Sequence, residues 1–106
     1  MENEEKAYFS IGQVVDHQMF GYRGVIYDVD ATFQQTEQWY ERVARSGPPK
    51  DQPWYHVLPD GGSHTTYVAE RNLEPVEEPT PVRHPLVAEY FDSFDGTLYQ
   101  LKRRVN

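Results

Sequence analysis

The sequence contains no cysteine among its 106 residues. Disulfide frameworks, thiolate metal sites and cysteine nucleophiles are therefore excluded, and the absence is typical of a reducing compartment. Long hydrophobic runs are also missing, because no stretch approaches the roughly 20 apolar residues that a membrane-spanning helix needs. Residues 1–6 contain three glutamates and have no apolar stretch behind them. We therefore expect no secretory signal, no membrane partner and a cytoplasmic location.

Positive charge is scarce as well. Seventeen acidic residues face ten lysines and arginines, and the formal net charge is -7. This sign excludes a broad electrostatic attraction to nucleic acid or to an anionic membrane. The end of the chain differs, since Lys102, Arg103 and Arg104 form a short basic tail. Such a tail is usually a solvated terminus, but it is also a candidate contact site.

Aromatic residues, in contrast, make up 14% of the chain. Each such side chain buries about 150 to 250 Å² when it is covered, so a small domain has difficulty covering them all. We expect at least two or three members of one set to be exposed as interface anchors. The alternative is that the set packs under a helix as a second small core. The set comprises Tyr22, Trp39, Tyr40, Trp54, Tyr55 and Tyr67.

The first third of the chain has strand-like patterning. Residues 11–30 contain two β-rich runs separated by a turn marked by glycine. In the second run, alternation predicts that Val25, Tyr27 and Val29 share the core face of a strand. Two glycines at the start of this run, three residues apart, predict a bulge or a close approach of another backbone.

Two helices are predicted. Residues 36–47 have helical spacing, with Thr36 as the N-cap and Gly47 at the end, and indicate one helix of about ten residues. A second, short helix of about two turns is predicted to begin near Pro85, because proline is favoured in the first turn of a helix.

Further strands follow the first helix. Two β-prone runs, residues 54–58 and 64–69, flank a loop of turn residues and predict a hairpin. A last strand is predicted over residues 97–103. A single domain over residues 9–105, preceded by an acidic and disordered segment 1–8, accommodates all of these elements.

The predicted fold class is therefore mainly β. About five short strands with two helical insertions indicate a small, strongly bent antiparallel β-barrel, and an open α+β roll is the alternative. Six positions are predicted to be mostly buried, because their alternation with polar neighbours leaves one face for a core. They are Val14, Val25, Tyr27, Val57, Val68 and Leu101.

The polar residues form no pattern typical of catalysis or of metal binding. Asp28 and Asp30 alternate along a strand, but two carboxylates fall short of the six or more oxygens that a hard cation takes. His56 and His64 could meet across the hairpin, but the third and fourth ligands that zinc needs are not indicated. Neither a phosphate-binding glycine loop nor a nucleophile elbow is present. We expect a non-enzymatic protein with no catalytic residue, no metal and no cofactor.

Several uncommon blocks occur in a characteristic order. They are FGYRGVIYDVD at residues 20–30, WY at 39–40, PKDQPWYHVL at 49–58 and TTYVAERNL at 65–73. Together these blocks resemble the heat shock protein HspQ family, whose domain is also called the YccV-like or hemimethylated-DNA-binding domain. The resemblance covers almost the whole chain.

The resemblance implies a small SH3-like antiparallel β-barrel in a cytoplasmic bacterial protein that self-associates, as a trimer. It also implies two functions that differ from each other. One is binding to hemimethylated DNA, and the other is assistance to the ATP-dependent protease Lon in degrading particular or denatured proteins during heat stress. Related domains in plant protease adaptors and in eukaryotic F-box proteins favour the second.

We therefore expect a heat-shock regulatory or adaptor protein that promotes Lon-dependent degradation through protein contacts. The alternatives are a module that recognises hemimethylated DNA and a purely structural homo-oligomer. For DNA, an aromatic ring beside a cation, as at Tyr22 and Arg23, is a pairing that binds nucleic acid. The candidate binding residues are Tyr22, Arg23, Trp39, Tyr40, Trp54, Tyr55, Tyr67, Lys102, Arg103 and Arg104.

Overall fold

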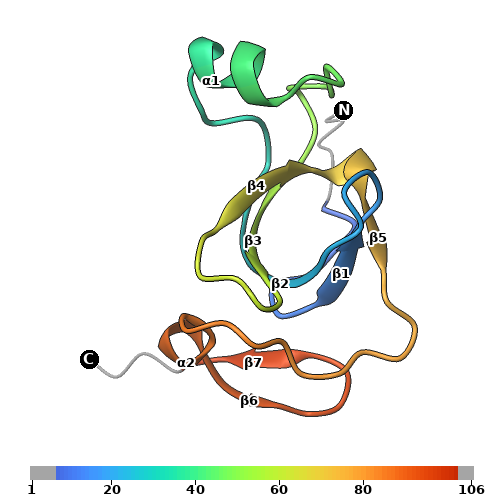
Figure 1. Cartoon of the computed structure of the whole chain (residues 1–106), viewed down its shortest axis with the longest axis vertical. Helices are drawn as coiled ribbons and strands as arrows, with labels where there is room; N and C mark the ends of the chain where they lie inside the picture. Colours follow the sequence, from blue (N-terminus) through green and yellow to red (C-terminus); the bar gives the residue numbers. More distant parts are fainter. Residues whose placement is uncertain (1–6, 103–106) are drawn as a thin grey trace, which may run out of the picture.

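The computed structural model describes residues 7–102 and contains two antiparallel sheets. The larger sheet has five strands in the order β4-β3-β2-β1-β5 and curls strongly (Figure 1). Its strands are β1 (Val14–His17), β2 (Arg23–Asp30), β3 (Trp54–Pro59), β4 (Thr66–Ala69) and β5 (Leu73–Pro75). A single turn of 3-10 helix, η1 (Glu70–Asn72), connects β4 to β5.

The remaining elements lie at two opposite ends of the molecule. Helix α1 (Glu37–Val43) stands at the top of Figure 1, beyond the sheet. At the bottom are helix α2 (Val87–Tyr90) and the smaller sheet, which pairs β6 (Phe91–Phe94) with β7 (Tyr99–Leu101). Within residues 7–102, neither helix is long and apolar enough to cross a bilayer.

This architecture confirms the mainly β, antiparallel prediction with two helices. The closed barrel is not confirmed, because the five-stranded sheet has β4 and β5 at its edges and no ladder joins them in the described part of the chain. The sheet curls so that its two edge strands approach each other at η1, the turn that connects them along the chain.

The elements near the C-terminus differ from the sequence prediction. The second helix has only four residues, because Phe91 leaves the helical conformation and pairs with Leu101 at the start of β6. Strand β6 was not predicted, and neither was β5, which pairs with β1. The predicted last strand is shortened to β7.

The five-stranded sheet is covered on both faces. One core cluster lies inside the curl and contains Phe9, Val15, Ile26, Tyr55, Val57, Val68 and Leu73. The other lies between the sheet and the C-terminal elements and contains Val14, Val25, Leu58, Val82, Phe91 and Tyr99. Adjacent residues such as Val25 and Ile26 are therefore both fully buried.

A bulge alters the predicted alternation in β2. The register between β2 and β3 shifts between Ile26 and Asp28. Beyond the shift Val29 packs with the cluster of Ile26, whereas Tyr27 packs with that of Val25. The prediction that Val29 shares a face with Val25 is therefore wrong, since the extra residue of a bulge moves later side chains to the other face.

Four of the six predicted core positions are buried, namely Val14, Val25, Val57 and Val68. Tyr27 is only half-buried. The prediction for Leu101 is wrong, because it ends the small two-stranded sheet beyond the second core and is 51% exposed.

Local signals in the sequence were more reliable. The hairpin of β3 and β4 is present with Tyr55 opposite Val68. Thr36 is the N-cap of α1, and its hydroxyl accepts a hydrogen bond from the backbone N–H of Trp39. The predicted close approach is found at Gly24, where an added Cβ would lie 2.6 Å from Val57 Cγ1 and 2.7 Å from the carbonyl oxygen of Leu58.

A candidate binding groove

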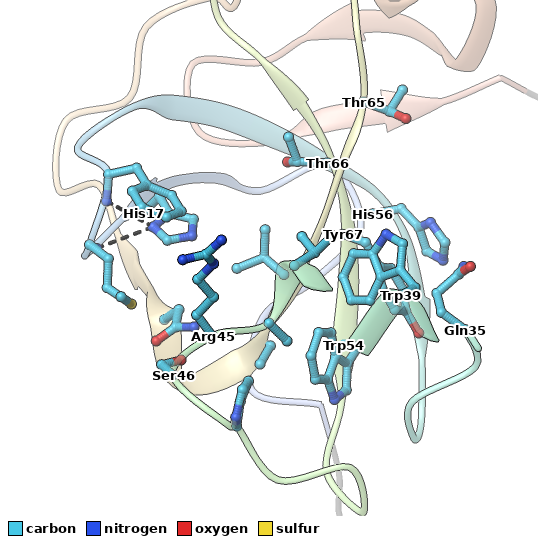
Figure 2. Close-up of a pocket in the computed structure, with 18 of the residues that line it drawn as sticks. His17, Gln35, Trp39, Arg45, Ser46, Trp54, His56, Thr65, Thr66 and Tyr67 are labelled. Atoms are coloured by element: carbon cyan, nitrogen blue, oxygen red, sulfur yellow. Dashed lines mark hydrogen bonds between the residues drawn. The ribbon is translucent and has the colours of Figure 1, made fainter. Parts of the chain in front are cut away.

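A groove of about 670 Å³ opens beside the edge strand β4 (Figure 2). Three segments that are distant in the sequence form it: the β1–β2 turn at residues 18–22, helix α1 with residues 44–48 after it, and β4. The volume lies within the range of about 300 to 1,000 Å³ that is usual for ligand sites.

Exposed apolar side chains gather in this groove. Met19 and Phe20 belong to the β1–β2 turn and are 54% and 74% exposed, and Val43 at the end of α1 is 51% exposed. All three line the groove. The other large hydrophobic residues that the described chain exposes are Tyr8, Tyr90 and Leu101. Half of the large hydrophobic side chains that residues 7–102 expose thus lie at one site.

The charge of the groove is opposite to that of the protein. Among residues 7–102, its lining includes Arg42, Arg45 and two histidines but no aspartate or glutamate, although the chain has 17 acidic residues. Neither arginine makes an ion pair within residues 7–102. In the view of Figure 2 the Arg45 side chain lies between His17 and Tyr67.

His17 organises the β1–β2 turn. Its ring is buried, and its Nδ1 atom accepts hydrogen bonds from the backbone N–H groups of Met19 and Phe20, both at 3.1 Å. The ring also stacks on Phe20, with 4.6 Å between centroids. Burial lowers the pKa of His17, which favours the neutral ring that these two bonds require. His17 therefore positions the apolar tip of the turn.

A hydroxyl pair joins this turn to the edge strand. The Tyr22 hydroxyl lies 2.7 Å from Oγ1 of Thr66 on β4. Burial raises the pKa of the Tyr22 phenol. Both residues line the groove, so this contact sets the distance between two of its sides.

An aromatic cluster supports α1 and the floor of the groove. Trp54 stacks on Tyr67 with 5.2 Å between centroids, and Trp39 meets Tyr67 edge-on at 5.6 Å. Phe33 and Tyr40 complete the cluster. Edge-on and offset ring pairs of this kind add to the stabilisation from burial.

Three residues of the cluster use their polar side-chain atom in a hydrogen bond within the protein. Trp54 Nε1 donates to the carbonyl oxygen of Pro49 at 3.0 Å, and the Tyr40 hydroxyl donates to that of Pro48. The Tyr67 hydroxyl donates to Asp30, which also contacts His56. Burial, followed by the bond to Asp30, raises the pKa of the Tyr67 phenol.

The expectation that several rings of the predicted aromatic set would be exposed is wrong. Trp54 and Tyr55 are buried, and Tyr22, Trp39, Tyr40 and Tyr67 are half-buried. The alternative, a second small core under the helix, describes four of them, because Trp39, Tyr40, Trp54 and Tyr67 pack on one another.

Tyr55 belongs to a different region. It lies in the core inside the curl, where its hydroxyl donates to Glu70 and accepts from the backbone N–H of Phe9. Burial, together with the bond to Glu70, raises the pKa of the Tyr55 phenol. Its contacts are those of a core residue, and it does not line the groove.

Arg23 does not form a shared surface with Tyr22. Its guanidinium donates to Asp60 at 2.9 Å and to carbonyl oxygens of Thr80 and Pro81. These contacts tie β2 to the segment that leads to α2. The combined aromatic and cationic face predicted from adjacency is therefore not formed, because Tyr22 bonds to Thr66 on β4 whereas Arg23 bonds to Asp60.

The remaining candidates are dispersed. Tyr22, Trp39, Trp54 and Tyr67 line the groove, whereas Tyr40 does not. Lys102 is exposed beside α2 at the other end of the molecule, and its backbone N–H donates to Tyr90. Arg103 and Arg104 lie outside the described residues, as do residues 1–6 of the predicted acidic segment.

Sequence reasoning missed Met19, Phe20, Arg42, Val43 and Arg45. One signal was available, because two large apolar residues at the tip of a turn replace the polar residues that turns favour. The two arginines lie three residues apart on and just after a helix, a spacing that places side chains on one face. Their meeting with the turn required the fold.

The histidines form no metal site in the part of the chain that the structure describes. His56 lies opposite Tyr67 and contacts Asp30, with 3.1 Å between Nε2 and Oδ2. His64 lies in the turn between β3 and β4, where its carbonyl oxygen contacts His84. His56 and His64 therefore have different partners, and no hydrogen bond joins them within residues 7–102.

Comparison with known proteins identifies the domain. Residues 7–98 match the family model described as "Hemimethylated DNA-binding protein YccV like". F-box only protein 21 of Mus musculus is 38% identical over 104 residues, and that of Homo sapiens is 37% identical over 100 residues. The alignments cover 93% and 92% of this chain but only 16% of each relative. The resemblance found in the sequence is confirmed, and the chain belongs to the YccV-like family.

Proposed function

We propose that this protein is a non-enzymatic, cytoplasmic heat-shock adaptor that promotes degradation of specific or denatured proteins by the ATP-dependent protease Lon. The groove beside β4 is its contact surface for other proteins. The observation that carries the proposal is the collection of exposed Met19, Phe20 and Val43 in one concave site.

Exposed apolar side chains support this interpretation on energetic grounds. Scattered hydrophobic residues are normal on protein surfaces, but their concentration in one place is typical of an interaction site. Covering apolar area releases about 25 cal/mol per Å², and a partner that fills the groove recovers this free energy. An adaptor needs such a surface while its own fold remains intact.

Electrostatics also favours a protein partner. With a net charge of -7 the body repels polyanions, and only two arginines of the described chain line the groove. Few phosphates can be neutralised there, so binding to DNA would weaken steeply with salt. An apolar contact supplemented by two cations would persist at physiological ionic strength.

Recognition of hemimethylated DNA is the second candidate function, and the family description favours it. The groove supplies Arg42, Arg45 and half-buried rings, which are the group types that bind phosphates and bases. A pocket for one methyl group would have to use Tyr22, because Trp54 is 1% exposed and covered by its neighbours.

Degradation of a Lon substrate, with and without the added protein in nuclease-treated buffer, tests the adaptor proposal. The wild-type protein should increase the degradation rate, and Phe20→Ser should reduce this increase. Tyr8→Ser is the matched control, since Tyr8 is 73% exposed and lies outside the groove. If the wild-type protein changes neither rate nor substrate affinity, and is not itself degraded, the adaptor proposal fails.

Binding to hemimethylated and unmethylated duplexes at several salt concentrations tests the second candidate. Equal affinities for the two duplexes would remove the role in methyl recognition. Tight binding at about 200 mM salt would show that DNA, not protein, is the main partner.

We also propose that the protein is a homo-oligomer, and specifically a trimer, as the HspQ resemblance implies. Tyr90 and Leu101, both exposed near α2, are candidate contacts. Light scattering at tens of micromolar should give a mass above 12.4 kDa.

The basic tail that begins at Lys102 is a second candidate contact for Lon, and truncation after Leu101 tests it in the degradation assay.

A further inference from the structure

The groove beside β4 also indicates the chemistry of its occupant. We propose that it binds an extended peptide segment of a partner protein that carries an acidic side chain next to a large apolar one. The carboxylate pairs with Arg42 and Arg45, and the apolar side chain packs against Met19, Phe20 and Val43. The inference rests on the proposed function, because it specifies what the adaptor surface recognises.

The two arginines support an acidic partner. Both side chains are exposed and line the groove, and neither is neutralised by a described carboxylate. A guanidinium presents a planar fork of donors that fits a carboxylate in a bidentate pair. The absence of acidic residues from the described lining leaves such a carboxylate without a repelling neighbour.

The apolar residues define the second requirement. Met19 and Phe20 are held on a turn fixed by His17, while Val43 ends α1. Because the turn is anchored before binding, little ordering of its backbone opposes the contact. Methionine adapts to different shapes, so the site accepts a class of apolar side chains and not one type.

The backbone of β4 supports an extended conformation of the peptide. The backbone N–H of Glu70 donates to the carbonyl oxygen of Pro53. This pair continues the antiparallel register of β3 and β4 one step beyond Trp54 and Ala69. Bonded pairs recur at every second residue, so Val68 also bonds to β3 and the backbone groups of Tyr67 point to the free side. Strand β4 is an edge of the sheet.

The free backbone groups of Tyr67 face the edge of β4 that lines the groove. Outside the ladder with β3, they have no hydrogen-bond partner within residues 7–102. An extended peptide beside an edge strand gains main-chain hydrogen bonds there, while its side chains reach the surrounding pockets. Backbone, charge and apolar contacts are thus available to one ligand.

A nucleic-acid occupant fits these features less well. Its bases would find one largely exposed ring, Phe20, beside the aliphatic Met19 and Val43, and its successive phosphates would find two arginines among the described lining residues. The surrounding surface is that of a protein with net charge -7. A peptide with few charges avoids this repulsion.

Fluorescence anisotropy with a defined probe tests the proposal. The probe is a short, fluorescein-labelled peptide of alternating leucine and glutamate, and its sibling has lysine in place of every glutamate. At about 150 mM salt, the acidic peptide should bind at least about tenfold more tightly than the basic sibling. The double variant Arg42→Gln/Arg45→Gln should lose this preference, and Phe20→Ser should weaken both peptides.

Matched controls separate the groove from general effects of charge and exposure. Arg83→Gln removes one positive charge from a side chain that is 85% exposed and outside the groove. Tyr8→Ser removes an exposed aromatic ring that also lies outside the groove. Both should bind the acidic peptide as the wild type does. Circular dichroism of each variant verifies that it is folded. If Arg42→Gln/Arg45→Gln is misfolded, Arg42→Lys/Arg45→Lys replaces it, and this variant should keep the preference for the acidic peptide but bind it more weakly.

Three results would overturn the inference: equal binding of the two peptides, equal losses in the groove variants and in the controls, or displacement of the peptide only by a DNA duplex that binds more tightly. The degradation assay tests the adaptor function independently of the peptide site. If the peptide binds as described but Lon activity is unaffected, the proposed function fails and the peptide site stands. If the protein increases Lon activity but binds the two peptides equally, the peptide site fails and the adaptor function stands.

Discussion

Large hydrophobic side chains differ in solvent exposure between the region beneath helix α1 and the groove beside it. Beneath the helix, Trp54 and Tyr67 stack on each other, and the polar side-chain atom of each is hydrogen-bonded within the protein. Beside it, Phe20 and Val43 remain more than half exposed along the groove. The bulkier residues are thus covered, and smaller ones carry the accessible surface.

The difference arises from the number of neighbouring segments. Trp54 lies in β3, with a strand on each side of it and α1 above. Phe20 lies at the tip of a turn, where one ring, that of His17, is its stacking partner. A residue's type therefore predicts how much apolar area it offers, while the chain around it decides whether that area is core or interface.

The largest effect is expected from Trp54→Ala. Removal of this buried ring leaves a cavity next to Tyr67 and Phe33 and leaves the carbonyl oxygen of Pro49 without its donor. We expect the free energy of unfolding to fall by about 3 to 5 kcal/mol. Urea unfolding followed by far-UV circular dichroism measures it. A loss below about 1 kcal/mol would show that the cluster is not a core.

A smaller loss is expected from Gly24→Ala, which tests the sheet that supports both regions. The new Cβ would meet Val57 and the carbonyl oxygen of Leu58, so we expect a loss of about 1 to 3 kcal/mol. Gly62→Ala is the control, because its nearest neighbour is the movable His64 ring at 3.2 Å. Equal effects of the two substitutions in urea unfolding would contradict the close packing at Gly24.

The pH dependence of stability tests the turn that carries Met19 and Phe20. Burial lowers the pKa of His17 from 6.5 in the folded state. As the pH falls, the His17 ring of the unfolded chain therefore takes up a proton at a higher pH than that of the folded chain. The contribution of neutral His17 to the free energy of unfolding is fully present above pH 6.5 and is lost as the pH decreases toward the lowered pKa. One such proton contributes a slope of up to about 1.4 kcal/mol per pH unit.

The variant His17→Asn isolates this contribution. Its side-chain oxygen can accept the bonds now made to Nδ1, yet it does not titrate. Unfolding free energies measured from pH 7.5 to 5.5 should fall less steeply for the variant than for the wild type. Parallel curves would assign the pH dependence to other groups.

The smallest effect on stability is expected from Phe20→Ser. Since the ring is 74% exposed, the free energy of unfolding should change by less than about 0.5 kcal/mol. The same substitution should weaken peptide binding, so its two readouts diverge where those of Trp54→Ala coincide. A large loss of stability would place Phe20 in the core and remove the contrast between the two sides of α1.

Interactions between nearby residues were predictable from the sequence. The N-cap at Thr36 and the hairpin of β3 and β4 depend on neighbours in the chain, and both are present. The face of Val29 was not predictable, because a bulge depends on the register with β3, a strand more than twenty residues further along the sequence.

The candidate site was only partly predictable for a related reason. Aromatic composition indicated that rings such as Trp39 and Tyr67 matter, but it did not distinguish support from contact. The groove exists because a turn near Phe20, a helix end near Arg45 and the edge of β4 meet in space. No local pattern encodes a meeting of three distant segments.

The position of the small β6–β7 sheet determines where a cargo can be attached. This sheet and α2 lie at the end of the molecule opposite α1 (Figure 1), and Lys102 follows directly after β7. A surface tether, a reporter or a second domain joined after Lys102 would leave from the end away from the groove. Immobilisation through this end should keep the groove open to solution, whereas attachment within residues 44–48 would obstruct it.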